Sequence, residues 1–344
     1  MKLFLQNGTT LEGTRFGADV AVSGEVVFNT GMTGYVEGLT DPSYAGQILV
    51  CTYPLIGNYG VPKGPLFESE RIQVAGLVVA NYSEIYSHRE ATKSLGAWLK
   101  ENNVPAITGI DTRALTKRLR EEGVMLGQLT SSEPLDHFAD PNEENLVAKV
   151  SIKEKRVYGS GRTKIIAIDC GMKENIVRSL ARPKVELVRV PWDYDFSSEN
   201  YDALFISNGP GDPTMCAPTI AQIKIAMQKS KPILGICLGN QLLALAAGAN
   251  TYKLKYGHRS QNQPCIDTET NRCYITSQNH GFAVDEKSLP ADWTVWFSNA
   301  NDGSNEGIRH KSQPWRSVQF HPEASPGPTD TAWIFDEFLR SLRV

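Results

Sequence analysis

The sequence predicts an α/β protein with a β-rich α+β N-terminal domain and a C-terminal domain built on a doubly wound, mostly parallel sheet. The length of 344 residues is enough for two domains of roughly 150 residues each. A charged, glycine-bearing segment with little apolar content, residues 151–163, is typical of a linker. After it, short apolar strands alternate with helices. We therefore expect domains at residues 1–150 and 164–344.

The N-terminal half contains β-type stretches separated by glycine-rich turns. Two strands and two helices are expected, at residues 20–30, 46–54, 91–103 and 111–123. In the second helix Asp111 is a plausible N-cap, and Gly123 follows the last turn. Leu115 and Leu119 lie four residues apart and therefore share one helix face.

The C-terminal half has the pattern of a parallel sheet. Residues 163–171 form a near-continuous apolar run, as in a strand that is covered on both faces. Strands are also expected in 185–192, 201–213 and 232–239, and helices at 173–182, 217–230 and 240–248. Ligands of such sheets bind in the loops that follow the carboxyl ends of strands. Here those loops are residues 208–213 and 237–239.

Composition argues against several classes of function. The net charge is −3 and no long run of lysine or arginine occurs, so nucleic acid is not the expected partner. No window approaches the roughly 20 apolar residues of a membrane helix. The first residues do not form a signal peptide, because their apolar part is short and turns polar at once. A cytoplasmic location is expected.

The cysteines are scattered and form no C-x-x-C pair. They are Cys51, Cys170, Cys216, Cys237, Cys265 and Cys273. Neither a disulfide framework nor a zinc site is expected from this spacing, and no metal ligand is assigned. Most of these residues are expected to be buried or free thiols in a reducing compartment.

Cys237 is the candidate exception, because it lies in the sequence GICLG between a strand and a helix. The pattern fits the G-x-nucleophile-x-G turn, which exposes a nucleophile at the top of a sheet. A helix N-terminus behind the sulfur favours the thiolate. The backbone N–H of Leu238 is then a natural donor to an oxyanion. A packed strand end would give the same short pattern.

A cysteine nucleophile needs a base and a group that orients this base. His321 and Glu323 offer such a pair, and if Val318 and Phe320 lie on a strand, His321 falls at its carboxyl end. His280, in QNHGF, is the competing candidate. The loop SNGPGDP could present backbone groups to a substrate, or it could be an ordinary tight turn. No P-loop for ATP occurs.

Together, GICLGNQ, SNGPGDP, QNHGF and FHPE resemble the class I, triad-type glutamine amidotransferases from about residue 163 to the C-terminus. Residues 24–62 and 109–123 look like the small, glutaminase subunit of carbamoyl phosphate synthetase. The resemblance implies that the C-terminal sheet is of the class I glutaminase type. It also implies that the N-terminal domain completes the glutamine site and contacts a large subunit.

The resemblance further implies a reaction. Cys237 attacks the side-chain amide of L-glutamine, His321 shuttles the proton, and Glu323 orients His321. A glutamyl thioester forms, water releases glutamate, and ammonia passes through an internal tunnel to the large synthetase subunit. That partner uses ATP, Mg and bicarbonate to make carbamoyl phosphate for arginine and pyrimidine synthesis. No cofactor is expected in this chain.

The glutamine-binding residues implied by the resemblance come from both domains. They are Ser43, Gly209, Gly211, Leu238, Gln241, Asn279, Gly281 and Phe282. One departure is visible, because the family more often has histidine where this chain has Asn240. Asparagine can form hydrogen bonds but cannot titrate, so an acid or base role at this position is in doubt.

Two rival functions remain open. A cysteine hydrolase or peptidase could use the same elbow, although the extra N-terminal domain and the QNHGF and SNGPGDP loops argue against it. A non-catalytic regulatory subunit is the second rival, and the retained Cys237 argues against that interpretation.

Overall fold

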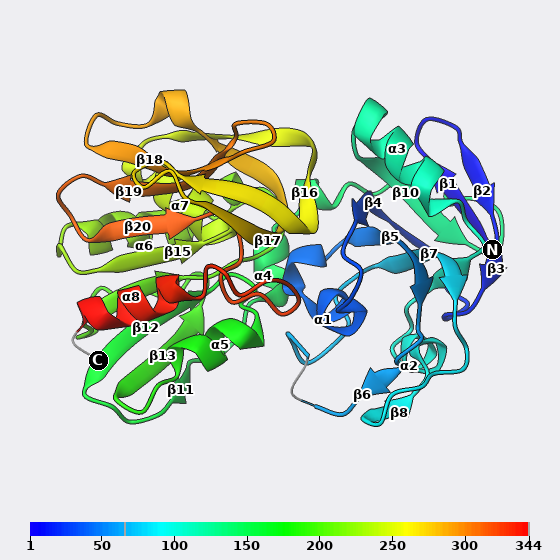
Figure 1. Cartoon of the computed structure of the whole chain (residues 1–344), viewed down its shortest axis with the longest axis horizontal. Coiled ribbons are helices and arrows are strands. Elements are labelled where there is room, and N and C mark those ends of the chain that lie inside the picture. Colours follow the sequence, from blue (N-terminus) through cyan, green and yellow to red (C-terminus); the bar gives the residue numbers. More distant parts are fainter. Residues whose placement is uncertain (65–66, 343–344) are drawn as a thin grey trace. The chain divides into compact units, whose positions relative to one another are not determined.

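The chain divides into two compact units, Met1–Glu144 and Asn145–Val344, which are traced in a computed structural model (Figure 1). The structure describes residues 1–64 and 67–342. The division falls earlier than the expected domain end at residue 150. Each unit has a hydrophobic core of its own.

The N-terminal unit is built on an eight-stranded sheet, counted over its described residues, with the order β2-β1-β10-β4-β5-β7-β9-β3. The strands of this unit are β1 (Lys2–Leu5), β2 (Thr10–Glu12), β3 (Thr14–Arg15), β4 (Val22–Asn29), β5 (Gln47–Ile56), β6 (Val61–Pro62), β7 (Gly76–Tyr82), β8 (Ala91–Lys93), β9 (Ala106–Thr108) and β10 (Met125–Thr130). Of these, β6 and β8 pair with each other in a separate two-stranded sheet. Its helices are α1 (Tyr35–Thr40), α2 (Leu95–Glu101) and α3 (Thr112–Glu122), with 3₁₀ turns η1 (Pro42–Tyr44) and η2 (Pro141–Glu143). The strands β4, β5, β7 and β9 run parallel and the flanking strands antiparallel, as expected of a β-rich α+β domain.

The two helices expected in this unit have different outcomes. The helix at 111–123 is confirmed: the Asp111 side chain accepts a hydrogen bond from Ala114 N at 2.9 Å, and Gly123 follows α3 with φ 104°. The helix expected at 91–103 is wrong at its start. Residues 91–93 form the short strand β8. The helix α2 begins only after Ser94, whose backbone is extended and whose Oγ accepts a hydrogen bond from Ala97 N. A good N-cap thus ended the strand and started the helix.

The second unit contains a ten-stranded sheet within its described residues, in the order β11-β13-β12-β14-β15-β20-β19-β18-β16-β17. Its strands are β11 (Arg156–Tyr158), β12 (Thr163–Asp169), β13 (Val185–Pro191), β14 (Ala203–Ile206), β15 (Ile233–Ile236), β16 (Asn250–Asp267), β17 (Cys273–Asp285), β18 (Trp293–Asn299), β19 (Asn305–His310) and β20 (Trp315–Val318). Its helices are α4 (Leu146–Val150), α5 (Glu174–Leu180), α6 (Ala217–Met227), α7 (Leu238–Ala247) and α8 (Trp333–Ser341), with 3₁₀ turns η3 (Pro213–Met215) and η4 (Glu286–Ser288).

The five central strands of this sheet, β13-β12-β14-β15-β20, run parallel and confirm the predicted α/β core. Successive side chains of β12 point to opposite faces. Ile166 and Ile168 belong to the core that contains α6 and α7, whereas Ile165 and Ala167 belong to the core that contains α5 and α8. Helices therefore cover both faces, which explains why the strand reads as a continuous apolar run.

Beyond β20 the sheet continues in strands β19, β18, β16 and β17, which pair antiparallel. This extension was not among the expected elements. The strand expected through Phe320 ends at Val318, and Gln319 N instead donates to the carbonyl of Glu306 at 2.8 Å. The helix expected at 240–248 begins earlier, at Leu238.

The segment predicted as a linker, residues 151–163, contributes to the second unit. Within it β11 pairs antiparallel with β13, and the N–H of Gly161 donates to the Val185 carbonyl. The described cysteines are free thiols, and all except Cys273 are buried, as expected. Among the helices described in residues 1–64 and 67–342, none has the length and apolar character needed to cross a membrane.

Candidate active site

Cys237 lies at the sharp turn between β15 and α7, at the carboxyl edge of the parallel strands. Its backbone has φ 55° and ψ −105°, a region that is strained for a residue with a side chain. The turn is anchored because Cys237 N donates to the Val318 carbonyl of β20 at 2.8 Å. The residue is 1% exposed. The strained backbone is the geometry expected of a nucleophile elbow, whereas the burial of the thiol departs from the exposed position that the GICLG pattern predicts.

Two glycines allow the elbow and its neighbouring loop to pack closely. A Cβ atom on Gly239 would lie 2.2 Å from the Ile206 carbonyl oxygen of β14. A Cβ atom on Gly209 would lie 2.1 Å from the Cys170 carbonyl oxygen and 2.8 Å from the Leu238 side chain. The loop SNGPGDP therefore lies directly against the elbow. The N–H of Leu238 is at the first position of α7, where the helix itself provides no acceptor for it.

His321 follows β20, and its ring is fixed by Glu323. The Nδ1–H donates to Glu323 Oε1 at 2.6 Å, and the backbone N–H donates to the Ser277 carbonyl at 2.9 Å. Within the described residues, the other ring nitrogen, Nε2, has no hydrogen-bond partner. Burial by itself lowers the pKa of His321, but the negative charge of Glu323 and the sulfur of Cys237 outweigh it and raise this pKa to about 10.

Glu323 is held in turn by Lys173, which the sequence reasoning did not single out. Lys173 Nζ lies 3.2 Å from Glu323 Oε1 and also donates to the Ala324 carbonyl; the Lys173 side chain is 3% exposed. Burial raises the pKa of Glu323, but the charges of Lys173 and His321 overcome this and lower it to about 2. Lys173 follows β12, so its place in a loop at the carboxyl edge of the sheet was the available signal.

A sequence profile of the family described as Glutamine amidotransferase class-I matches residues 166–341, half of the chain. The chain belongs to this family. The carbamoyl-phosphate synthase small chain, CPSase domain, matches residues 3–129, so the N-terminal unit carries that domain. Both matches confirm the resemblance noted from the sequence motifs.

Three curated relatives of this amidotransferase chain are much longer than it is. Multifunctional protein CAD of Squalus acanthias is 55% identical over 355 residues, which cover 99% of this chain and 16% of that protein. Multifunctional protein pyr-3 of Neurospora crassa is 51% identical, with 99% and 21% covered. Carbamoyl-phosphate synthase [ammonia], mitochondrial, of Rattus norvegicus is 47% identical, with 99% and 24% covered. The chain thus spans less than a quarter of the length of these proteins.

A solved structure from Thermoplasma acidophilum, described as that of a GMP synthase subunit, aligns with this amidotransferase chain at a TM-score of 0.46 and 26% identity. The alignment covers 53% of this chain and 96% of that one.

The structure brings most of the expected glutamine-binding residues to the edge of the sheet around Cys237. The Cys237 sulfur lies 3.7 Å from the Asn279 carbonyl oxygen on β17, and Gln241 Nε2 donates to the Phe282 carbonyl at 2.9 Å. Gly281 lies between Asn279 and Phe282 on β17, and Gly209 lies against the Leu238 side chain. The binding roles of these residues stay a prediction.

Gly211 and Ser43 each lie in a local structure of their own unit. Gly211, with φ 83°, faces Leu146 of α4, since a Cβ atom there would lie 3.4 Å from the leucine side chain. Ser43 belongs to the N-terminal unit, where it lies in η1 and its backbone N–H donates to Asp41 Oδ1 at 2.9 Å. The part of both residues in a glutamine site likewise stays a prediction.

Asn240 is completely buried and is bound through both ends of its amide. Oδ1 accepts from Ser317 Oγ at 2.8 Å, and Nδ2 donates to Gln319 Oε1 at 3.3 Å. Both partners belong to β20 or to the residue that follows it. The side chain therefore links α7 to β20. These hydrogen bonds give Asn240 a structural role.

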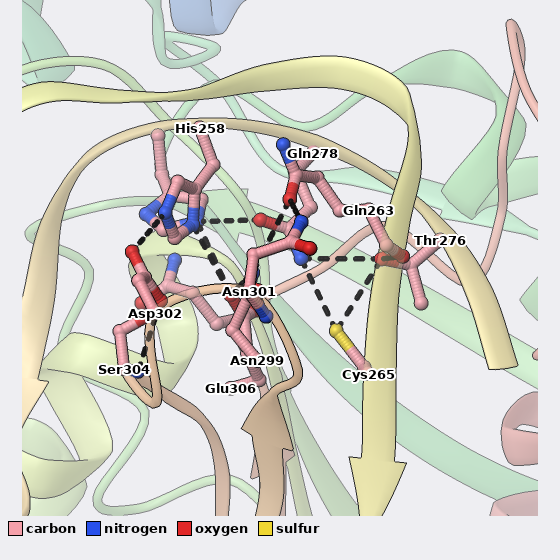
Figure 2. Close-up of polar contacts among 12 residues, drawn as sticks. His258, Gln263, Cys265, Thr276, Gln278, Asn299, Asn301, Asp302, Ser304 and Glu306 are labelled. Carbon is pink, nitrogen blue, oxygen red and sulfur yellow. Dashed lines mark hydrogen bonds and ion pairs between the residues drawn. The ribbon is translucent and has the colours of Figure 1, made fainter. Parts of the chain in front are cut away.

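His280, the competing base, lies in a second cluster with His258 and Glu306, whose ligand atoms lie within 4.8 Å of one another and could hold a metal ion. Figure 2 labels His258 and Glu306 of this cluster. His280 Nδ1 donates to the Phe282 carbonyl at 2.8 Å, and its Nε2 lies 3.1 Å from Gln278 Oε1. Burial, reinforced by the charge of His258, lowers the pKa of His280 well below its usual value. A ring that resists protonation is a weaker candidate for the base than His321.

Proposed function

We propose that this chain hydrolyses the side-chain amide of L-glutamine, with Cys237 as nucleophile and His321 as proton carrier. The observation that carries the proposal is the pair His321–Glu323 at 2.6 Å, together with the strained Cys237 whose sulfur acts on the pKa of His321. An oriented histidine next to a thiol at an elbow is the arrangement that activates a cysteine nucleophile. One relative is named for ammonia rather than glutamine, so family membership alone does not decide the nitrogen source.

The first half-reaction forms a thioester. The Cys237 thiolate attacks the amide carbon, and the oxygen of the tetrahedral intermediate accepts a hydrogen bond from the N–H of Leu238. The raised pKa of His321 keeps its ring protonated at neutral pH. The Nε2–H protonates the amide nitrogen, the C–N bond breaks, and ammonia leaves.

The second half-reaction returns the enzyme to its starting state. Neutral His321 takes a proton from water as the water oxygen attacks the thioester carbon. The C–S bond breaks, glutamate is released, and the thiolate faces a protonated His321 again. Glu323 stays ionised throughout, because Lys173 and His321 hold its pKa at about 2, and it orients the ring.

We further propose that the ammonia is passed to a synthetase partner that makes carbamoyl phosphate from bicarbonate and ATP with Mg. The small-chain domain at residues 3–129 and the relatives of greater length, two of them named multifunctional proteins, support this division of labour. In this proposal the partner holds the nucleotide and metal, and the product serves pyrimidine and arginine synthesis. A reducing, cytoplasmic location fits the free cysteines.

The test is glutamine turnover by purified protein, measured as glutamate and ammonia released, with and without the co-purified synthetase partner. We expect Cys237→Ser to lower the rate at least about 10⁴-fold, because the hydroxyl is a far weaker nucleophile here. Cys273→Ser, at an exposed thiol, is the matched control and should keep the wild-type rate. Turnover of Cys237→Ser at the wild-type rate would overturn the proposal.

A further inference from the structure

We propose that His258, His280 and Glu306 form a structural site for a divalent transition-metal ion, which zinc matches best, with the side-chain carbonyl of Gln278 as the fourth ligand. His258 lies on β16, His280 and Gln278 lie on β17, and Glu306 lies on β19. One ion therefore ties together three strands of the antiparallel extension. The site uses no cysteine, so the spacing of the cysteines gives no indication of it. The inference does not depend on the proposed glutaminase function.

Each histidine directs one ring nitrogen away from the proposed ion, to a group that fixes the proton there. His280 Nδ1 lies 2.8 Å from the Phe282 carbonyl oxygen, which only accepts, so Nδ1 carries the proton and Nε2 of the neutral ring has a lone pair. His258 Nε2 lies 2.8 Å from Asp302 Oδ2 and carries the proton for the same reason (Figure 2). The inner nitrogens, His258 Nδ1 and His280 Nε2, lie 3.2 and 4.0 Å from Glu306 Oε1. Metal-bound histidines show this arrangement, in which a carboxylate or a backbone carbonyl holds the outer N–H.

The lone pair of His280 Nε2 faces another acceptor, the Gln278 Oε1 atom, at 3.1 Å. The orientation of the Gln278 amide follows from Thr276. Thr276 Oγ1 donates to the Gln263 carbonyl at 2.9 Å, so it must accept from Gln278 Nε2, which lies 3.1 Å away (Figure 2). The carbonyl end of the amide is therefore the end that faces the ring. Two lone pairs at this distance repel each other unless both are directed at one cation.

Glu306 supplies a second sign that a cation belongs in the cluster. The residue is completely buried, and within residues 1–64 and 67–342 its Oε2 atom has no hydrogen-bond partner. Its other oxygen, Oε1, accepts from Asn299 Nδ2 at 3.0 Å. An ionised carboxylate in the interior is costly unless its charge is balanced and its lone pairs are used. A metal ion between Glu306 and the two rings meets both needs.

Protons alone satisfy the cluster less completely. A proton on His258 Nδ1 would serve Glu306 but would leave His280 Nε2 against Gln278 Oε1. A second proton, on His280, would place two positive rings edge to face at a centroid distance of 4.9 Å, where the two residues are only 6% and 5% exposed. One divalent ion instead accepts lone pairs from all four side chains and leaves both rings neutral. Its charge is balanced by Glu306 and Asp302.

The spacing of the ligand atoms favours zinc. The atoms of His258, His280 and Glu306 lie within 4.8 Å of one another. Ligands about 2.0–2.2 Å from a tetrahedral zinc ion are roughly 3.3 Å apart. Two edges of the cluster have nearly this length, 3.2 Å from His258 to Glu306 and 3.1 Å from His280 to Gln278, and the edge from His280 to Glu306 is wider at 4.0 Å. Two imidazoles and a carboxylate suit zinc, and an enclosed fourth position is typical of a structural ion.

The first test is the metal content of the wild-type chain purified from zinc-supplemented medium. Because the ligands are buried, the ion must enter during folding, and about one zinc per chain should remain after purification. Glu306→Gln and His258→Ala should each lose this zinc. Cys237→Ser should keep it, which excludes binding at the catalytic thiol. His310→Gln, which alters a histidine 3.6 Å from Asp292 on the same strand β19, should keep it as well.

A thermal melt distinguishes a lost ligand from a damaged fold. The zinc-loaded wild-type chain should unfold at a higher temperature than the same chain made in zinc-depleted medium, because the ion joins β16, β17 and β19. Glu306→Gln should unfold at one temperature whichever medium is used, because it has no site to fill. If Glu306 served the fold without a metal, the substitution would lower both melting temperatures and zinc would not change the wild-type value, which would overturn the proposal.

X-ray absorption at the zinc edge of the wild-type chain needs no variant to fold. We expect nitrogen and oxygen ligands at about 2.0–2.2 Å and no sulfur at about 2.3 Å. A wild-type chain without zinc, a sulfur ligand, or zinc retained in folded Glu306→Gln and His258→Ala would each overturn the proposal. None of these readouts uses glutamine turnover, so their failure leaves the proposed function standing, and a chain that binds zinc but does not hydrolyse glutamine would contradict only that function.

Discussion

Two buried histidine–carboxylate pairs lie in the same unit and are built for different tasks. In His321–Glu323 one ring nitrogen donates to the carboxylate, and within the described residues the other has no hydrogen-bond partner. In His258–Glu306 both nitrogens are occupied, because Asp302 takes the second. A histidine nitrogen that is not held by a carboxylate can give and take a proton, whereas both ring nitrogens of His258 are engaged by carboxylates. Pairing alone therefore does not make a catalytic histidine.

The counter-charges of the two pairs differ as well. The buried ammonium group of Lys173 forms an ion pair with Glu323 and helps to lower the pKa of this carboxylate. Glu323 therefore stays ionised while the ring of His321 changes protonation. Glu306 is completely buried and also accepts from Asn299 Nδ2 at 3.0 Å. Lys173 therefore supports Glu323 while His321 exchanges its proton, whereas Glu306 is held in place by its contacts with His258 and Asn299.

Among the substitutions that test this difference between the two histidines, His321→Asn should have the largest effect on kcat. Asparagine cannot carry the proton, so kcat for glutamine hydrolysis should fall about 10²–10⁴-fold while the protein stays folded. Steady-state glutamate release and a thermal melt measure the two quantities. If turnover were unaltered, His280 would become the base and the assignment of His321 as proton carrier would be wrong.

Glu323→Gln should have a smaller effect on catalysis, and it should shift the pH profile of kcat in one predicted direction. Against the opposing effect of burial, Glu323 and the Cys237 sulfur together raise the pKa of His321 to about 10, so removal of the Glu323 charge lowers that pKa. The protonated ring is present below this pKa and lost as the pH rises through it, so the alkaline limb of the activity profile should move to lower pH. A kcat profile from pH 6 to pH 10 tests this. An unchanged alkaline limb would show that Glu323 does not govern the charge of His321.

The smallest effect on catalysis is expected for Asn240→Ala. The substitution removes the hydrogen bonds to Ser317 and Gln319 and leaves buried polar groups unpaired, which should cost about 1–3 kcal/mol of unfolding free energy. Chemical denaturation measures this loss. The position of the pH profile should not change, because Asn240 does not titrate. A shifted profile would mean that the residue takes part in proton transfer after all.

The sequence predicted the first histidine pair better than the second for a physical reason. His321 and Glu323 are neighbours in the chain and follow a strand, so a local pattern reveals them. His258 and Glu306 are joined only when β16 and β19 enter the antiparallel extension, whose pairing involves residues far apart in the chain. Lys173 was missed in the same way, since it reaches Ala324 across 151 positions.

Helices and strands were predictable from the sequence where a single local feature, such as a capping residue or an apolar run, determines them. Asp111 and Gly123 set the ends of α3, and the continuous apolar run of β12 indicated a strand covered on both faces. The helix expected at 91–103 was wrong at its start because Ser94 is a strong N-cap within it. The composition of the charged segment 151–163 predicts a linker. Part of this segment forms the strand β11 because it pairs with β13, which lies about 30 residues further along the chain.

The most direct test of Cys237 as the nucleophile is to quench the wild-type chain during glutamine turnover and map the acylated peptide by mass spectrometry. We expect a glutamyl adduct confined to the peptide that carries Cys237, formed as ammonia is released and absent in Cys237→Ser. Glutamate release at full rate with the adduct on another residue, or with hydrolysis persisting in Cys237→Ser, would contradict this mechanism.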